Sequence, residues 1–156
     1  MSAGNESPAA RIVQSVTAGL IVCAAVLAAA GVYGVSWRRR NGRLRRATAG
    51  RRVDALTPAQ LGQPFGPRAT LVQFSSSLCA PCQATRRILA DVAATADGVA
   101  HIEIDAESRL DLVRSLGILT TPTVFVLGKD GTVLRRGTGQ PRRDDVIATL
   151  GAIAAG

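Results

Sequence analysis

Hydrophobic residues form one long unbroken segment near the N-terminus and several shorter segments after residue 53. The long segment runs from Ile12 to Trp37, which is 26 residues without a charge. A helix of that length, rising about 1.5 Å per residue, exceeds the roughly 30 Å hydrocarbon core of a bilayer. The pattern therefore predicts a transmembrane helix over residues 12–37, preceded by a short, polar and unstructured N-terminus of residues 1–11.

After residue 53, segments with strand-like and helix-like patterns alternate. Thr57 followed by Pro58 predicts the N-cap and first residue of a short helix. The order that follows is strand, helix, strand, helix, strand, strand, helix, over residues 69–75, 79–96, 99–105, 107–116, 123–127, 133–136 and 142–153. Asp130-Gly131, between the last two strands, is typical of a tight hairpin turn. We expect an α/β domain over residues 53–156, a mixed sheet with parallel crossover units and one antiparallel edge, flanked by helices.

The net charge of +8 lies entirely in the first third of the chain. Residues 1–52 contain nine arginines and one glutamate, whereas residues 53–156 contain ten basic and ten acidic residues. A neutral globular part with 3% aromatic residues overall argues against nucleic acid as a partner. Eight arginines follow the apolar segment in an Arg-rich juxtamembrane linker, residues 38–52: Arg38, Arg39, Arg40, Arg43, Arg45, Arg46, Arg51 and Arg52.

This charge asymmetry predicts the membrane topology. Basic residues are retained on the cytoplasmic side, so we expect a single-pass protein of the cell membrane with its N-terminus outside and the α/β domain in the cytoplasm. The arginines can also meet anionic headgroups of the lipid membrane. The alternative of a cleaved signal peptide, with an Ala-x-Ala site at residues 28–30, is disfavoured because the arginines follow the apolar segment. Cys23 follows Val22 in mid-segment and fits a small membrane-helix residue better than a lipid acceptor.

The candidate chemistry is the motif Cys79-Ala80-Pro81-Cys82, directly after the apolar run of residues 70–74. Its two thiols lie one helical turn apart, within disulfide reach, and the amides at a helix N-terminus stabilise a thiolate at the first position. Half of a zinc site is the alternative interpretation of a lone Cys-x-x-Cys. The motif therefore indicates thiol–disulfide chemistry, with no metal and no cofactor beyond the cysteine pair.

Zinc would need two more ligands, and the only further candidates are Cys23 and His101. Cys23 lies in the segment predicted to be embedded in the membrane. This position makes the zinc interpretation the weaker one.

The order of elements and motifs resembles the thioredoxin family over about residues 53–156. A strand precedes Cys-x-Pro-Cys at the start of a helix, and about forty residues later Thr121-Pro122 precedes a strand and the Asp130-Gly131 hairpin. The chain has no long insertion before Thr121, so the closest model is a compact, single-domain thioredoxin. The resemblance implies a thioredoxin-like fold and thiol–disulfide oxidoreductase activity.

The resemblance also implies roles for individual residues. Cys79 would attack a substrate disulfide and Cys82 would resolve the mixed disulfide. Pro122 would be a cis-proline beside the cysteines, exposing the backbone of Thr121 to pair with an extended substrate. Gly139 would let a substrate approach closely, with an ordinary loop glycine as the alternative. The expected site is Cys79 and Cys82 as catalytic residues, supported by Ala80, Pro81 and Gln73, with Leu78, Thr121, Pro122 and Gly139 binding substrate.

Several positions depart from the family. Leu78 stands where the family usually has tryptophan, after three consecutive serines, so the docking surface is less aromatic and more polar. Gln73 stands in place of the family's buried aspartate and cannot accept a proton, so we expect slower thiol exchange. His101 stands where lysine is common, and a structural histidine is the simpler interpretation.

We therefore expect a membrane-tethered thiol–disulfide oxidoreductase that acts on protein disulfide or dithiol substrates. In a reducing cytosol it would be a reductase or redox relay, supplied with electrons by a thiol reductase or a membrane electron donor that the sequence does not specify. One alternative is an extracytoplasmic oxidase or isomerase. A second alternative is a non-enzymatic redox-sensing module whose cysteine state controls the binding of a partner.

Overall fold

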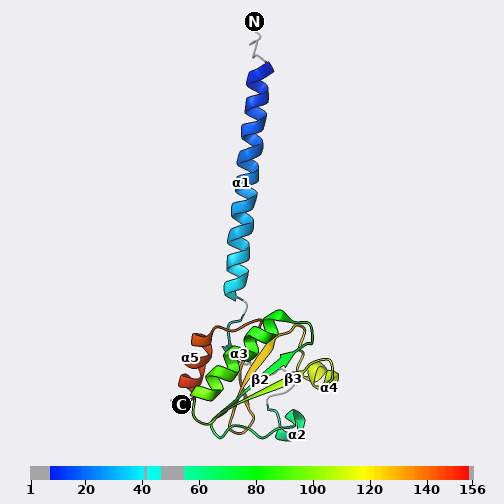
Figure 1. Ribbon diagram of the computed structural model, residues 1–156, viewed down its shortest axis with the longest axis vertical. Coiled ribbons are helices and arrows are strands. Elements are labelled where there is room, and N and C mark those ends of the chain that lie inside the picture. The colour runs from blue at the N-terminus through cyan, green and yellow to red at the C-terminus, as the bar shows by residue number, and fades with distance from the viewer. Residues whose placement is uncertain (1–7, 41, 47–54, 155–156) are drawn as a thin grey trace. The chain divides into compact units, whose positions relative to one another are not determined.

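The computed structural model describes residues 8–40, 42–46 and 55–154, and the chain divides into two units between Arg39 and Arg40. The first unit is built on helix α1, Pro8–Arg40 (Figure 1). This helix extends a few residues beyond both ends of the predicted span, so the expectation that residues 1–11 are unstructured is wrong from Pro8 onward. Proline fits at Pro8 because the first residue of a helix needs no amide hydrogen.

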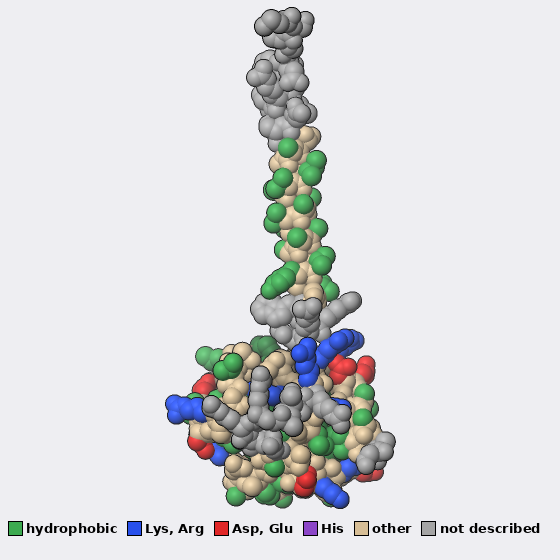
Figure 2. Space-filling model, turned by 180° about the vertical axis from the view of Figure 1, so that it is seen from behind, with side chains coloured by type: hydrophobic (Ala, Val, Ile, Leu, Met, Phe, Trp, Pro, Cys, Tyr) green, Lys and Arg blue, Asp and Glu red, His purple; other side chains and the backbone are tan. Residues whose placement is uncertain are grey.

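The stretch Thr17–Ser36 of α1 is long and apolar enough to cross a membrane, which confirms the predicted N-terminal helix. Figure 2 shows hydrophobic side chains along this stretch. Its large side chains are exposed, including Ile21, Leu27 and Val32. A helix of this length that is apolar on all sides has the composition of a candidate membrane span.

The second unit contains a five-stranded sheet in the order β1, β5, β4, β2, β3. The strands are β1 Arg45–Arg46, β2 Ala69–Ser75, β3 Val99–Asp105, β4 Thr123–Gly128 and β5 Val133–Thr138. Among the described strands, β2 and β3 form the one parallel pair, while β4 runs antiparallel to β2, and β5 antiparallel to β4. The mixed sheet is confirmed, but the expectation of several parallel crossovers is wrong. Side chains alternate in the same way in both strand directions, so the sequence pattern carried no information on direction.

Strand β1 lies in the segment that the sequence predicted to be a linker. Arg45 is opposite Arg136 and Arg46 opposite Arg135 at the edge of the sheet. The amide of Gly42 also donates a hydrogen bond to the carbonyl of Thr138, at 2.6 Å. The folded unit thus includes residues before Val53, and a two-residue strand is too short to produce a recognisable pattern.

Helices cover both faces of the sheet and bury two hydrophobic clusters (Figure 1). Helices α3, Ala80–Thr95, and α5, Arg143–Ala154, pack on one face through Leu89, Val92, Val146 and Leu150. Helices α2, Pro58–Leu61, and α4, Leu110–Ser115, pack on the other face through Leu61, Leu112 and Leu116. Strand β2 contributes to both clusters and is buried along its whole length, so its C-terminal end is a rigid support for the residues that follow.

Local hydrogen bonds explain where the short helices begin. Thr57 and Gln60 form a capping box, in which each side chain accepts the backbone amide of the other, as expected for the start of α2. Helix α4 starts at Leu110 rather than Glu107. The carboxylate of Asp105 accepts the amide of Glu107, and this local bond favours a turn over a helix.

Candidate active site

The junction of β2 and α3 places the cysteine motif at the end of the central buried strand. Cys79 is the N-cap of α3, with extended backbone angles of φ −115° and ψ 97°. The amide of Cys82 donates to the sulfur of Cys79 at 3.2 Å. The sulfur of Cys79 therefore occupies the position where helix amides stabilise a negative charge.

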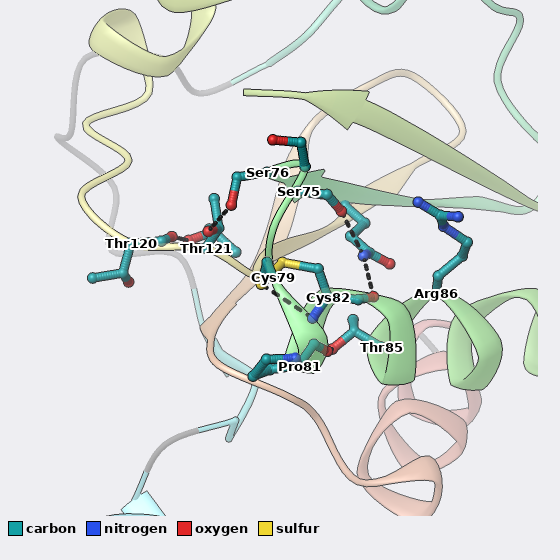
Figure 3. The surroundings of a disulfide bond; sticks show 12 residues. Ser75, Ser76, Cys79, Pro81, Cys82, Thr85, Arg86, Thr120 and Thr121 are labelled. Carbon is teal, nitrogen blue, oxygen red and sulfur yellow. Dashed lines mark hydrogen bonds between the residues drawn. A yellow bond between two sulfur atoms is a disulfide. The ribbon is translucent and has the colours of Figure 1, made fainter. Parts of the chain in front are cut away.

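Cys79 and Cys82 form a disulfide, with an S–S distance of 2.07 Å and 5.2 Å between the Cα atoms (Figure 3). Cys79 is half-buried, whereas only 2% of Cys82 is exposed. Ala80 and Pro81 are exposed in the first turn of α3, where a proline leaves no hydrogen bond unmade. Of the two sulfurs, that of Cys79 is the one more open to a substrate.

The loop before β4 lies beside the disulfide (Figure 3). The bond between Thr121 and Pro122 is cis, as the resemblance implies. The carbonyl of Pro122 accepts the amide of Gly139 at 2.7 Å, and Gly139 has a left-handed φ of 82°, which a side chain would disfavour. The structure thus brings Gly139 to Pro122 as a backbone partner and gives a reason for glycine there.

Gln73 lies beneath the disulfide and is fully buried. Its side-chain nitrogen donates to the carbonyl of Cys82 at 2.9 Å and to the hydroxyl of Ser75 at 2.7 Å. Its side-chain oxygen has no hydrogen-bond partner among the described residues. The amide thus binds the backbone of the second cysteine, a neutral contact in the place where the family has a carboxylate.

Sequence reasoning missed an extension of this network to the surface. The hydroxyl of Ser75 donates to Glu103 at 2.7 Å, and Arg86 donates to the same carboxylate at 2.8 Å. Burial raises the pKa of Glu103, but its hydrogen bonds with Arg86 and Ser75 outweigh burial and leave the pKa below the usual value. Glu103 is therefore ionised at neutral pH. The register that places Glu103 opposite Gln73 was the missing information, because sequence gives no strand register.

His101 lies two residues before Glu103 on β3 and is half-buried. Burial lowers its pKa, a shift that the nearby Glu103 opposes, so the imidazole is neutral at pH 7. Its Nε2 atom is buried and has no hydrogen-bond partner among the described residues. Among the described residues, this side chain forms no hydrogen bond with Gln73 or with either cysteine through Nε2, which keeps the structural interpretation the simpler one.

Polar residues surround a hollow of about 360 Å³ beside the disulfide. It is lined by Ser75, Ser76, Ser77, Cys79, Cys82, Gln83, Arg86, Glu103 and Asp105. Two leucines in the adjoining loops are almost fully exposed, Leu78 at 99% and Leu119 at 93%. The surroundings of the disulfide thus combine a polar hollow with isolated apolar side chains, and no aromatic side chain lines the hollow.

The fold and the disulfide define a protein of the thioredoxin class. The thioredoxin family model matches residues 63–152, more than half of the chain, and the chain belongs to this family. The family, the fold and the cysteine pair together support thiol–disulfide oxidoreductase chemistry. No curated protein matches the chain.

Solved structures of thioredoxins are similar to the second unit. Chloroplastic thioredoxin z is 29% identical with a TM-score of 0.53, and the alignment covers 58% of this chain and 81% of that one. A mutant thioredoxin from Halobacterium salinarum is 20% identical, with a TM-score of 0.51 and coverage of 55% and 74%. Thioredoxin f from spinach chloroplast is 22% identical, with a TM-score of 0.50 and coverage of 57% and 73%. The last two comparisons bear on the fold alone.

Proposed function

We propose that this protein is a membrane-tethered thiol–disulfide oxidoreductase that exchanges disulfides with protein substrates through Cys79 and Cys82. The observation that carries the proposal is the position of Cys79, whose sulfur accepts the Cys82 amide at the N-terminus of α3. A thiolate at this position is stabilised before it attacks. The chemistry needs no metal and no cofactor beyond the cysteine pair.

The reductase reaction proceeds in two exchanges. The thiolate of Cys79 attacks one sulfur of a substrate disulfide, forms a mixed disulfide and releases the other substrate sulfur as a thiolate. The thiolate of Cys82 then attacks the sulfur of Cys79, and the remaining substrate sulfur leaves as a thiolate. Two electrons pass from the cysteine pair to the substrate, and the released thiolates take up the two protons that the cysteines lost. A thiol reductase or membrane electron donor must then reduce the Cys79–Cys82 disulfide.

The loop beside the disulfide supplies the proposed binding site for the substrate. An extended substrate segment pairs with the backbone of Thr121, next to Pro122, as a strand added to an existing backbone edge. Gly139 supports this loop through its hydrogen bond to Pro122. Leu78, directly before Cys79 and almost fully exposed, adds an apolar contact.

The distribution of charge supports a cytoplasmic position of the thioredoxin domain. Eight arginines follow the apolar stretch of α1, within residues 38–52, whereas Arg11 is the only basic side chain before this stretch. Basic residues on one side of a membrane segment are retained in the cytoplasm. In that reducing compartment the pair acts as a reductase or redox relay, and α1 confines it to substrates near the bilayer.

Trapping of intermediates tests the proposed reaction. Cys82→Ser removes the resolving thiol, so we expect mixed disulfides between Cys79 and cellular proteins to accumulate. Cys79→Ser removes the attacking thiol, so we expect it to trap nothing and to reduce less than about 1% of the disulfide reduced by the unaltered chain. Non-reducing electrophoresis of the captured proteins measures both outcomes.

Cys23→Ser is the matched control, because Cys23 is exposed on α1 and forms no disulfide. This variant should reduce substrate at the unaltered rate. If the Cys82→Ser chain captures no protein and the unaltered chain reduces no protein disulfide, the proposal is wrong, and a redox-sensing module becomes the better interpretation.

A further inference from the structure

Three consecutive serines connect the loop before Cys79 to three different segments of the fold. Ser75 donates to Glu103 on β3 at 2.7 Å. Ser77 donates through its hydroxyl to Glu107, after the end of β3, at 3.2 Å. Ser76 shares a hydrogen bond of 3.0 Å with the hydroxyl of Thr121, in the loop that contains the cis-proline. The three serines precede Leu78, in the part of the docking surface that was expected to be polar, and their hydrogen bonds hold the loop in place.

The bond between Ser76 and Thr121 differs from the other two because it joins the two loops beside the disulfide (Figure 3). Ser76 lies three residues before Cys79, and Thr121 is directly bonded to Pro122. Both side chains are half-buried. On the other side of the loop, the carbonyl of Thr120 accepts the hydroxyl of Thr123 at 2.6 Å. The backbone around Thr121 is therefore fixed toward β4 by one bond and toward the cysteine loop by another.

We propose that Ser76 and Thr121 are positioning residues that hold the proposed substrate-pairing backbone at a set distance from the sulfur of Cys79. This inference rests on the proposed function. A substrate strand that pairs with Thr121 brings its disulfide to Cys79 only if the two loops keep a fixed spacing. Errors of about 1 Å in such a spacing cost up to about a hundredfold in rate. A small disulfide has no strand to pair and gains nothing from the spacing.

The substrate range of the site follows from this arrangement. The hydrogen bond favours disulfides in extended polypeptide segments over small disulfides, because only a polypeptide contacts both loops at once. It contributes nothing to the reactivity of the sulfur, since among the described residues neither hydroxyl forms a hydrogen bond with Cys79 or Cys82. Its loss should therefore change the selection of substrates and leave the chemical step as it is.

The test uses the full chain in detergent micelles. The cysteine pair is reduced beforehand, so no electron donor is needed, and the rate of a single turnover is measured separately with each of two substrates. Insulin provides disulfides in a polypeptide, and cystine provides a disulfide without an extended backbone. Thr121→Val keeps the shape of the side chain without the hydroxyl, and Ser76→Ala removes the other partner. We expect each variant to react about tenfold more slowly with insulin and within about twofold of the unaltered rate with cystine.

Three further variants sharpen the test. Thr121→Ser keeps a hydroxyl and should retain most of the insulin rate. Ser77→Ala removes the hydroxyl bonds between the same loop and Glu107, leaves the bond from the Ser77 amide and the contact with Thr121 in place, and should retain the rates with both substrates. The double variant of Ser76→Ala and Thr121→Val should be no slower with insulin than either single variant, because one shared bond is lost only once.

Three outcomes would each overturn the inference. These are an equal loss of rate with insulin and with cystine, additive losses of the insulin rate in the double variant, and the same loss of the insulin rate in Ser77→Ala. Unchanged insulin rates in Ser76→Ala and Thr121→Val would overturn it as well, while the proposed function stood. An unaltered chain that reacts with neither substrate would instead overturn the proposed function and, with it, this inference.

Discussion

At the scale of single residues, the site differs from the family pattern mainly in the group beneath the disulfide. Gln73 is neutral at every pH at which the protein is folded, and it binds the carbonyl of Cys82 through its nitrogen. The nearest carboxylate in this network, Glu103, is held ionised by Arg86 and reaches Gln73 only through Ser75. Among these hydrogen bonds, no carboxylate is placed directly against Cys82 to accept the proton of its thiol. This arrangement agrees with the slower exchange expected from Gln73.

His101 makes the stability of the fold depend on pH. Its pKa in the folded state is lowered, chiefly by burial, whereas in the unfolded chain it is about 6.5. As the pH falls through that value, the unfolded chain binds a proton more readily than the folded chain, so stability decreases. We expect the thermal unfolding midpoint of the unaltered chain to fall between pH 8 and pH 5.5, and His101→Leu to reduce this fall. Differential scanning calorimetry at both pH values measures the change.

Glu103 acts in a different pH window. Its pKa is also lowered, so its contribution to stability is present above the unfolded value of about 4.3 and is lost at more acidic pH. A fall between pH 8 and pH 5.5 is therefore assigned to histidine rather than to this carboxylate. An equally steep fall in His101→Leu would show that another group is responsible.

At the scale of elements, the hairpin between β4 and β5 depends on one glycine. Gly131 has a φ of 83°, and a side chain there would collide with the carbonyl of Leu56 and approach the ring of Phe65 to 2.8 Å. We expect Gly131→Ala to lower the free energy of unfolding by about 3 kcal/mol, because the strain of a left-handed residue adds to a backbone clash. Chemical denaturation of the full chain in detergent measures the loss.

Gly62 is the matched control, since it also has a left-handed φ, of 72°, but nothing lies within 4 Å of an added side chain. Gly62→Ala should cost only about 1 kcal/mol. Equal costs for both variants would mean that the clash at the hairpin relaxes freely.

The bounds of some helices and strands could be predicted from the sequence, whereas other features of these elements could not. The bounds of β2 and β3 were predicted to the residue, because β2 is a mostly apolar run and β3 alternates apolar with polar residues. The start of α4, the direction of β4 and the existence of β1 were missed, since each depends on local hydrogen bonds or on pairing with distant segments. In the same way, the motif predicted a cysteine pair, but the bonds from Ser75 and Ser76 join residues 28 and 45 positions apart, which no sequence spacing indicates.

At the scale of the whole molecule, the proposed topology gives a direct prediction. A fluorescent reporter that matures only in the cytoplasm, fused to the C-terminus, should fluoresce, whereas an export-dependent phosphatase at the same position should be inactive. Replacing Arg38, Arg39, Arg40 and Arg43 by serine should lower the fluorescence and raise the phosphatase activity, because it weakens the charge asymmetry. An active phosphatase in the unaltered fusion would place the disulfide site outside the cytoplasm and favour an oxidase or isomerase.

The pairing of β1 with β5 has a consequence for how the molecule avoids self-association. The outer edge of a strand presents unpaired amides and carbonyls that recruit strands of other molecules. Residues 42–46 cover part of that edge on β5, through the β1 pairs and the bond from Gly42 to Thr138. A fragment that starts at Val53, where the periodic pattern begins, would lose these residues and expose the unpaired edge of β5. A fragment that starts at Gly42 would keep the edge covered. Strand β1, which contains Arg45 and Arg46, thus also protects this edge and should discourage copies of the domain from pairing edge to edge.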